Sequence, residues 1–271
     1  MTSINTNVGA LIALRNLNLT NVELEKVQDR VSTGFKVIGP KDDASNFSIA
    51  QGLRADLKAF DAVQQSLSAG RGVVAAAIAG AENLSNLLAE MKQKVIQAAN
   101  PANTSNQQSI LSADFDNMVQ QLNAFVTNAV YNGRNIISSG SGSVSITSTI
   151  TGGQLTIVNA STLGGVSTAL SSGVATTTGA LALLTAVTAQ ELIVGTALGT
   201  LGANAKNIDF QSTFSRTLSD AVTEGLGALV DADLAKESAK LQALQVKQQL
   251  GVQALSIANK RPEIILGLFR S

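Results

Sequence analysis

The stretch "LRNLNLTNVELEKVQDRV" (residues 14–31) decides the fold. Leu17, Leu24 and Val31 are spaced seven residues apart, and Leu14 and Val27 fill the turns between them. This spacing places an apolar seam along one side of a helix, as in a coiled coil. We predict a helix over residues 4–33 that stops at Gly34, because glycine readily adopts the left-handed conformation that ends helices.

The C-terminal part of the chain carries a second seam of the same kind. It predicts a helix over residues 228–259, interrupted by Pro262 ahead of an apolar end. Both ends are therefore built to pack against each other or against other copies. The seam residues share spacings of three, four and seven: Val230, Leu234, Leu241, Leu244, Leu255 and Ala258.

Between these ends the pattern is again mostly helical. Helices are predicted over residues 43–99 and 104–130, because a residue that precedes a proline, here Asn100, avoids the helical region. The Ser/Thr-rich segment 138–178 contains two β-branched runs around Thr151-Gly152-Gly153, which indicates a β-hairpin. A further helix is predicted over 180–225, which makes the fold mainly α.

Composition excludes several classes of function. The chain has no Cys and no His, so it lacks thiolate ligands, the commonest metal ligand and the usual general base. With 19 basic and 19 acidic residues and no basic block, it is not built for nucleic acid. The N-terminus has no Lys or Arg before Arg15 and no A-x-A-like cleavage site, so a Sec-type signal peptide is not expected. The most apolar stretch, 180–201, carries Gln190 and Glu191 at its centre, which argues against a membrane span. No cofactor is expected.

The stretch "KDDASNFSIA" (residues 41–50) could be a catalytic or metal-binding pair, or the start of a helix. A metal site needs further oxygen ligands at fixed offsets, but the next acid after Asp42 and Asp43 is Asp56. Adjacent carboxylates also point in different directions, whereas glycosidase pairs face each other. We therefore interpret these residues as the start of a helix, because aspartate accepts hydrogen bonds from the free N–H groups of a first helical turn.

Several of these stretches resemble bacterial flagellins, in the right order at both ends of the chain. The resemblance covers about residues 1–136 and 200–271, and the short middle and absent His are similar to the small flagellins of alphaproteobacteria. The matching stretches are "SINTNVGALIALRNL" (3–17), "DRVSTGFKV" (29–37), "KDDASNFSIA" (41–50), "YNGRNI" (131–136), "LGANAKNI" (201–208) and "VDADLAKESAKLQALQVKQQLGVQALSIANKRPEIILGLF" (230–269).

The resemblance implies an architecture. The terminal helices would pair as a coiled coil lining the inner tube of a filament (D0), a helical rod domain (D1) would surround it, and a small β-hairpin insertion would face outward. Lys41, Asp42 and Asp43 would set the joint between D0 and D1. The implied parts are an N-terminal D0 helix (1–36), two D1 parts (37–134 and 180–226), an outward Ser/Thr-rich region (135–179) and a C-terminal D0 helix (227–271).

The resemblance also implies a function. The chain would be a non-enzymatic subunit that polymerises with itself, and with sibling flagellins, into the flagellar filament. A hook–filament junction protein of the same superfamily is the alternative. Implied partners are the flagellar export apparatus, a chaperone, and the filament cap and junction proteins. The protein would be secreted into the filament outside the cell and would bind neither nucleic acid nor a membrane. The assembly seam would then comprise Leu17, Leu24, Val31, Leu234, Leu241 and Leu244.

Overall fold

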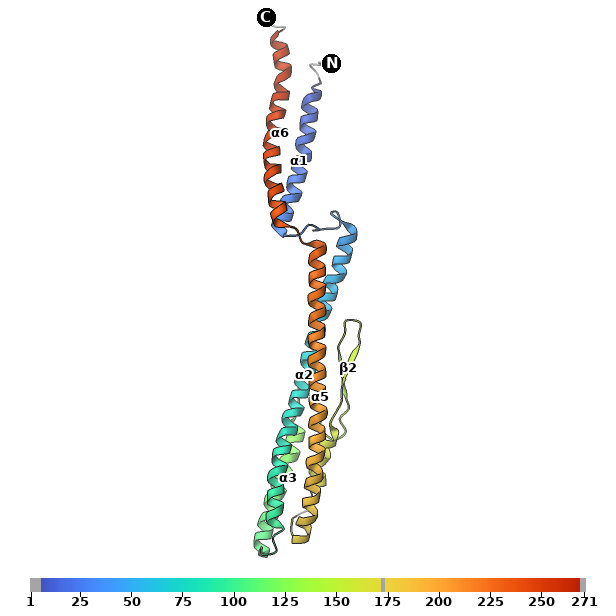
Figure 1. The fold of residues 1–271 in the computed structure, drawn as a ribbon, viewed down its shortest axis with the longest axis vertical. Coiled ribbons are helices and arrows are strands. Elements are labelled where there is room, and N and C mark those ends of the chain that lie inside the picture. The colour runs from blue at the N-terminus through green and yellow to red at the C-terminus, as the bar shows by residue number, and fades with distance from the viewer. Residues whose placement is uncertain (1–5, 172–173, 269–271) are drawn as a thin grey trace. The chain divides into compact units, whose positions relative to one another are not determined.

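The computed structural model describes the backbone of residues 6–171 and 174–268, and side chains as far as residue 260. The described chain is mainly α-helical with one small sheet, which confirms the predicted fold class (Figure 1). The elements in chain order are α1 (Val8–Thr33), α2 (Ala44–Ala98), α3 (Ser105–Asn128), β1 (Val144–Thr147), β2 (Gln154–Ile157), the 3₁₀ turn η1 (Ser161–Gly165), α4 (Val166–Ala169), α5 (Thr177–Val230) and α6 (Leu234–Leu268).

The chain divides into two compact units. Unit 1 is formed by residues 1–55 and 221–271, and unit 2 by residues 56–220. Within unit 1, α1 and α6 lie side by side and run antiparallel, so the first turns of α1 and the last turns of α6 are neighbours (Figure 1). The helix α1 begins at Val8, later than the predicted residue 4, and is capped by Asn7, whose Oδ1 accepts from the N–H of Ala10 at 3.1 Å. It stops at Gly34, as predicted, where φ is +77°.

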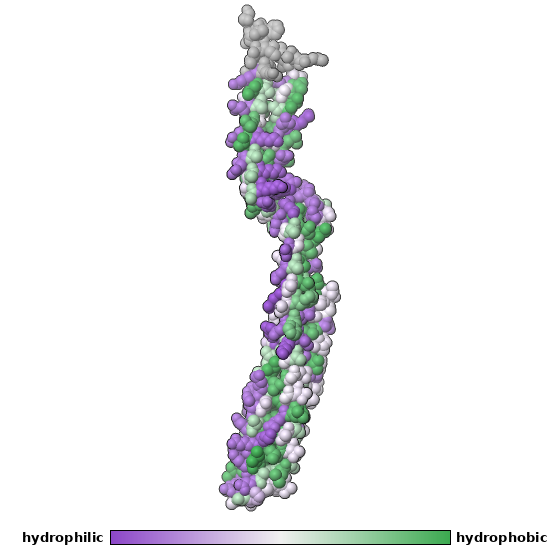
Figure 2. Space-filling model, in the orientation of Figure 1, coloured by the Kyte–Doolittle hydropathy of each residue, from purple (hydrophilic) through white to green (hydrophobic). Residues whose placement is uncertain are grey.

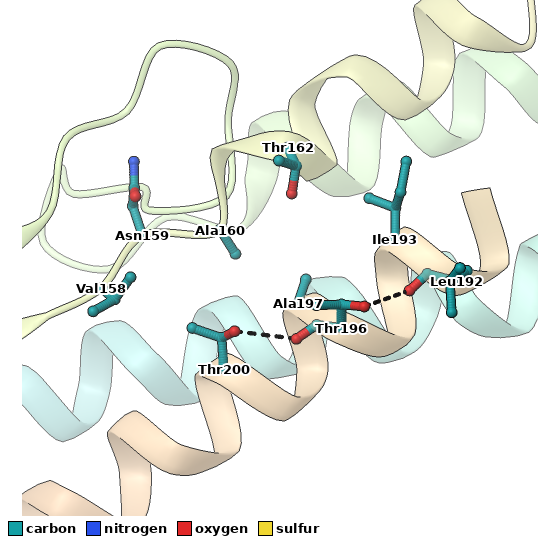
Figure 3. A pocket seen from close by; sticks show the side chains of 9 residues that line it. All are labelled: Val158, Asn159, Ala160, Thr162, Leu192, Ile193, Thr196, Ala197 and Thr200. Atoms are coloured by element: carbon teal, nitrogen blue, oxygen red, sulfur yellow. Dashed lines mark hydrogen bonds between the residues drawn. The ribbon is translucent and has the colours of Figure 1, made fainter. Parts of the chain in front are cut away.

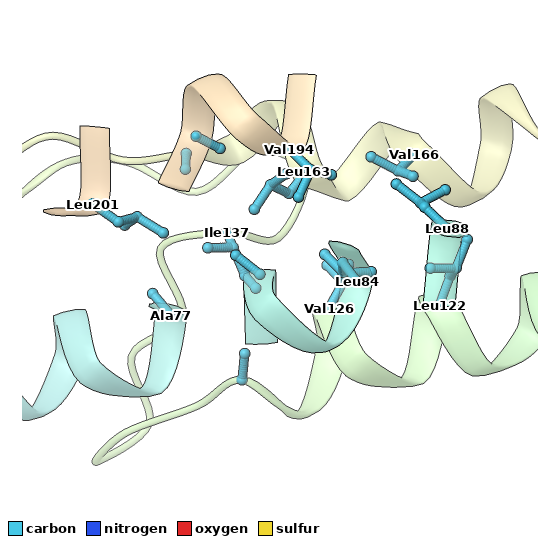
Figure 4. Close-up of a cluster of buried hydrophobic side chains, with 14 of the residues drawn as sticks. Ala77, Leu84, Leu88, Leu122, Val126, Ile137, Leu163, Val166, Val194 and Leu201 are labelled. Atoms are coloured by element: carbon cyan, nitrogen blue, oxygen red, sulfur yellow. The ribbon is translucent and has the colours of Figure 1, made fainter. Parts of the chain in front are cut away.

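Unit 2 is held together by helices whose buried positions alternate in steps of three and four residues. This is a spacing of 3.5, which keeps one side of each helix toward its neighbours. Leu84 and Leu88 of α2, Leu122 of α3 and Leu201 of α5 are fully buried in this core (Figure 4). The buried positions of α2 that follow this spacing are Phe60, Val63, Leu67, Gly70, Val74, Ala77, Ala81, Leu84, Leu88, Met91, Val95 and Ala98; Ala50, Val73 and Gly80 are buried beside them.

The predicted hairpin is confirmed. Strands β1 and β2 pair antiparallel, with Val144 opposite Ile157 and Thr147 opposite Gln154. Gly152 turns the chain with φ +87°. Ile146 and Ile157 face α2 at Gly70, where an added Cβ would lie 2.5 Å from Ile146 Cδ1. The missing side chain at Gly70 therefore lets the hairpin pack against the helix.

Two predicted boundaries are wrong at the C-terminal end. The helix α5 continues to Val230 instead of stopping at 225, and α6 begins at Leu234 instead of 228. The break falls there because Asp233 accepts from the N–H of Lys236 at 3.1 Å and so caps a new helix. At the other end, predicted helical residues 4 and 5 lie outside the described residues.

The predicted interruption at Pro262 is also wrong, because α6 runs through it to Leu268. A proline inside a helix leaves the carbonyl four residues earlier without its donor. Here that carbonyl belongs to Ala258, and it accepts a hydrogen bond from Asn7 Nδ2 at 2.7 Å. A side-chain donor from α1 thus bonds the carbonyl that the N–H of residue 262 would otherwise bond.

Core packing in unit 2 gives a first prediction. Leu88→Ala should lower the free energy of unfolding by about 2–5 kcal/mol, since Leu88 is 0% exposed and its removal leaves a cavity. Leu192→Ala is the matched control, because Leu192 is 75% exposed and its truncation should change stability by less than about 0.5 kcal/mol. Urea unfolding followed by circular dichroism measures both; equal midpoints for the two variants would contradict the assigned core.

Candidate assembly site

The terminal helices α1 and α6 share a single seam inside unit 1. On each helix the buried or partly buried residues recur at alternating three- and four-residue steps. This is the pattern of an antiparallel two-helix coiled coil. The seam positions are Ala10, Ala13, Leu17, Thr20, Leu24, Val27 and Val31 on α1, and Glu237, Leu241, Leu244, Gln248, Gly251, Leu255 and Ala258 on α6.

The structure brings most of the predicted seam residues together. Leu17, Leu24 and Val31 are partly buried on α1, Leu241 is partly buried on α6, and Leu244 is 5% exposed. Leu234 differs, because it lies in the first turn of α6 and is 50% exposed. Within one chain it is not part of the seam.

Polar side chains cross the seam at two further levels that the sequence analysis missed. Gln248 donates from Nε2 to Asn21 Oδ1 at 2.8 Å, and Arg30 Nη1 lies 3.4 Å from Glu237 Oε1. Arg30 Nε and Glu237 Oε2 are buried without a hydrogen-bond partner. The seven-residue period could have predicted the seam position of Gln248, because Gln248 follows Leu241 by one heptad. The seam is therefore narrow and partly polar.

The joint between α1 and α2 is a short loop held by backbone hydrogen bonds to the α5–α6 connection. Lys36 N donates to Val230 O at 2.7 Å, and Ala232 N donates to Gly34 O at 2.8 Å. Behind this bridge Val37, Ala50 and Val230 form a small buried cluster. Both connections are thus fixed to each other, which sets how the helices of unit 1 leave the joint.

Asp42 and Asp43 have separate roles at this joint. Asp43 caps α2, since its Oδ1 accepts from the N–H of Asn46 at 3.0 Å. Asp42 instead holds the loop: its Oδ2 accepts from the N–H groups of Ile38 (3.1 Å) and Gly39 (3.3 Å), and its Oδ1 lies 3.2 Å from Lys26 Nζ on α1. These bonds, that from Ile38 first, hold the pKa of Asp42 below its ordinary value.

Lys41 is exposed beside this pair. Together with Lys26, Arg30 and Asp42 it lines a hollow of about 360 Å³ on unit 1. The described residues contain no group of three or more acidic side chains placed to hold a metal ion. The joint consists of a helix cap, a loop and backbone hydrogen bonds.

Large apolar side chains remain exposed on the outer faces of the α1–α6 pair. Figure 2 shows hydrophobic residues among hydrophilic ones on this surface. Each lies between 43% and 64% exposed. They are Val8, Leu11, Ile12, Leu14, Leu19 and Val22 on α1, and Val246, Leu250, Val252 and Ile257 on α6. Leu14 is one of them, so its predicted place inside the seam is wrong.

Unit 2 carries an apolar groove of about 400 Å³ between the segment after β2 and α5 (Figure 3). Val158, Ala160 and Ile193 line it. The two threonine hydroxyls that α5 contributes donate to carbonyls of that helix, Thr196 to Leu192 at 2.9 Å and Thr200 to Thr196 at 3.1 Å. The groove therefore offers apolar surface and no constellation of titratable groups.

The helices α2 and α5 are long and apolar enough to cross a membrane, judged by length and composition alone. Each uses one face in the core of unit 2. Glu191, at the centre of the most apolar stretch, pairs with Lys92 of α2 at 2.6 Å. The absence of a membrane span remains a prediction.

The helical ends of the chain match two known sequence families. Residues 4–141 match the bacterial flagellin N-terminal helical region, and residues 184–269 match the bacterial flagellin C-terminal helical region. The chain belongs to the bacterial flagellin family. It is thus a structural subunit of the flagellar filament, and none of the matches favours the hook–filament junction alternative.

Full-length relatives agree with this assignment. Flagellin FljM of Caulobacter vibrioides is 39% identical over 271 residues, covering 100% of this chain and 99% of its own length. A flagellin of Brucella melitensis is 36% identical over 285 residues and is covered completely. Among solved structures, a putative flagellar hook-associated protein from Vibrio parahaemolyticus is similar over 70% of this chain and 100% of its own. Its TM-score of 0.59 and 14% identity support the fold alone.

The loop contacts of Asp42 predict a pH-dependent contribution to stability. Because its pKa is depressed in the folded chain, that contribution is fully present above the ordinary value of 3.8 and is lost as the pH falls below it. Asp42→Asn should lower Tm by about 1–3 °C near neutral pH. The gap between variant and parent should close as the pH falls below 3.8.

The control for this measurement is Asp29→Asn, which removes an exposed carboxylate near the same loop. It should leave Tm within about 1 °C of the parent. Scanning calorimetry at several pH values measures all three chains. A Tm gap for the Asp42→Asn chain that does not change with pH would count against the loop assignment.

Proposed function

We propose that this flagellin polymerises with copies of itself by burying the outer faces of the α1–α6 pair against neighbouring subunits. The observation that supports this is the set of exposed apolar side chains on both helices, which the intramolecular seam leaves uncovered. Contiguous exposed apolar surface marks an interaction site in a soluble protein. Identical subunits with head-to-tail contacts that do not close produce a helical filament.

The same proposal gives the joint a mechanical role. Asp42, Asp43 and the backbone bridge between Lys36 and Val230 fix the two connections of the joint to each other. A filament that transmits torque needs its subunits to keep a defined geometry at such a connection. Lys41, Asp42 and Asp43 therefore set the geometry at the joint of each subunit.

Further partners follow from the filament's place outside the cell. The chain would be exported by the flagellar secretion apparatus, accompanied by a chaperone until export. It would then be inserted beneath the filament cap, above the junction proteins, alone or with sibling flagellins. The segment 135–179 faces outward in this arrangement. These partners are inferred from family membership.

The outward and inward faces of α6 can be separated by mutation. Leu250 is 64% exposed, whereas Leu241 is partly buried in the seam. Leu250→Asp should abolish sedimentable filaments while leaving helix content unchanged, because a carboxylate would be buried only on polymerisation, at a cost of several kcal/mol. Leu241→Asp should abolish filaments and also weaken the α1–α6 pair within the chain.

Thr151→Asp, at the exposed hairpin turn, is the control and should polymerise like the parent. Ultracentrifugation and negative-stain microscopy score filaments, and circular dichroism scores helix content. Normal filaments from the Leu250→Asp chain would refute burial of this face. Equal loss of filaments in the Thr151→Asp chain would refute the outward position of the hairpin.

A further inference from the structure

A proline lies inside α6 where an uninterrupted helix would need a backbone N–H. Residue 262 carries no such donor, so the carbonyl of Ala258 cannot make its bond within the helix. An unpaired buried carbonyl is costly, and a proline normally kinks or ends the helix. Here α6 extends from Leu234 to Leu268 without a break.

Asn7 supplies the missing donor from the other end of the chain. Its Nδ2 donates to Ala258 O at 2.7 Å, across a separation of 251 residues. Its Oδ1 accepts from the N–H of Ala10 at 3.1 Å and thereby caps α1. The side-chain amide of Asn7 thus caps α1 through its oxygen and bonds the Ala258 carbonyl of α6 through its nitrogen.

We infer that Asn7 is a positioning residue that fixes the register in which α1 and α6 pair. Pro262 is the sole proline between residues 234 and 268 of the sequence, so Ala258 has the one interior carbonyl of α6 that lacks an i+4 donor. A shift of one heptad would place Asn7 near a carbonyl already bonded within the helix. It would also leave Ala258 O unpaired. Only one register satisfies both groups.

Two other levels of the seam agree with this register. Gly251 faces Leu17, and an added Cβ on Gly251 would lie 3.8 Å from Leu17 Cβ and 3.2 Å from its Cδ1. The amide pair of Asn21 and Gln248 lies between that level and the joint. A polar pair inside a coiled-coil seam disfavours shifted alignments, because a shift would bury each amide against apolar side chains.

The consequence for the filament rests on the proposed function. The relative positions of the exposed apolar side chains on α1 and α6 depend on how the two helices are aligned. A shifted pair would present a different surface to the neighbouring subunits. The contact between Asn7 and Ala258 would therefore select subunits whose two ends are correctly joined.

The register can be read by cross-linking, because the chain has no cysteine of its own. The Cβ separation of 3.8 Å between positions 17 and 251 matches that of a disulfide. A chain carrying L17C and G251C should form this disulfide readily. A chain carrying L24C and G251C reports a shift of one heptad and should stay at background.

The decisive variants are N7D and P262A in the L17C/G251C chain. N7D keeps a capping oxygen but removes the donor and places a carboxylate oxygen against the carbonyl of Ala258. It should slow disulfide formation about tenfold. Adding P262A returns a helical N–H to that carbonyl, so the double variant should recover to within about twofold of the parent. N18D, which makes the same chemical change at an exposed asparagine, should have no effect.

An unchanged rate with N7D, or no recovery with P262A, would overturn the inference, as would efficient cross-linking of the shifted pair in the parent. Recovery by P262A would assign the slower cross-linking to the unpaired carbonyl of Ala258 and not to general misfolding, because it restores a bond to that one group. The cross-link reports register whether or not the chain polymerises. A parent that gave the expected cross-links but no filaments would contradict the proposed function and leave the register result standing.

Discussion

A pair of antiparallel helices can bury only one side of each helix, and the rest of this molecule depends on that limit. The seam between α1 and α6 takes up two positions per heptad, and the remaining apolar side chains stay in contact with water. Two isolated helices of this kind are marginally stable, because burial of one strip barely offsets the conformational entropy that is lost. Further burial requires other subunits, and in the proposed assembly polymerisation completes the hydrophobic core of unit 1.

In unit 2 each long helix again buries mainly one side, but more elements pack together than in unit 1. Its buried positions follow a 3.5-residue spacing in α2, and a third helix and a hairpin cover faces that a pair would expose. Many of these positions are small. An added Cβ at Gly80 would lie 2.8 Å from Ala129 Cβ, so close approach of the backbone replaces bulky side chains there. This packing explains how a chain with 3% aromatic residues still forms a continuous core.

The sequence predicts those features that depend on residues close together in the chain. Periodicity predicts the long helices, Gly34 predicts the end of α1, and the turn at Gly152 predicts the hairpin. It fails where the deciding partner is remote. The loop role of Asp42 toward Lys26 and the hydrogen bond that Ala258, four residues before Pro262, receives from Asn7 each involve a residue elsewhere in the fold. No local rule for proline includes a donor that arrives from residue 7.

The polar contacts across the α1–α6 seam favour specificity over stability. Arg30 and Glu237 are largely removed from water, yet Arg30 Nε and Glu237 Oε2 have no partner, and such pairs contribute little net stability. Leucine at positions 21 and 248 would bury more apolar surface, but it would allow α1 and α6 to pair in several registers. For a subunit whose stability comes from its neighbours, a weak seam with one permitted register suits assembly better than a strong seam with many. Misaligned ends would otherwise persist long enough to be buried in the growing polymer.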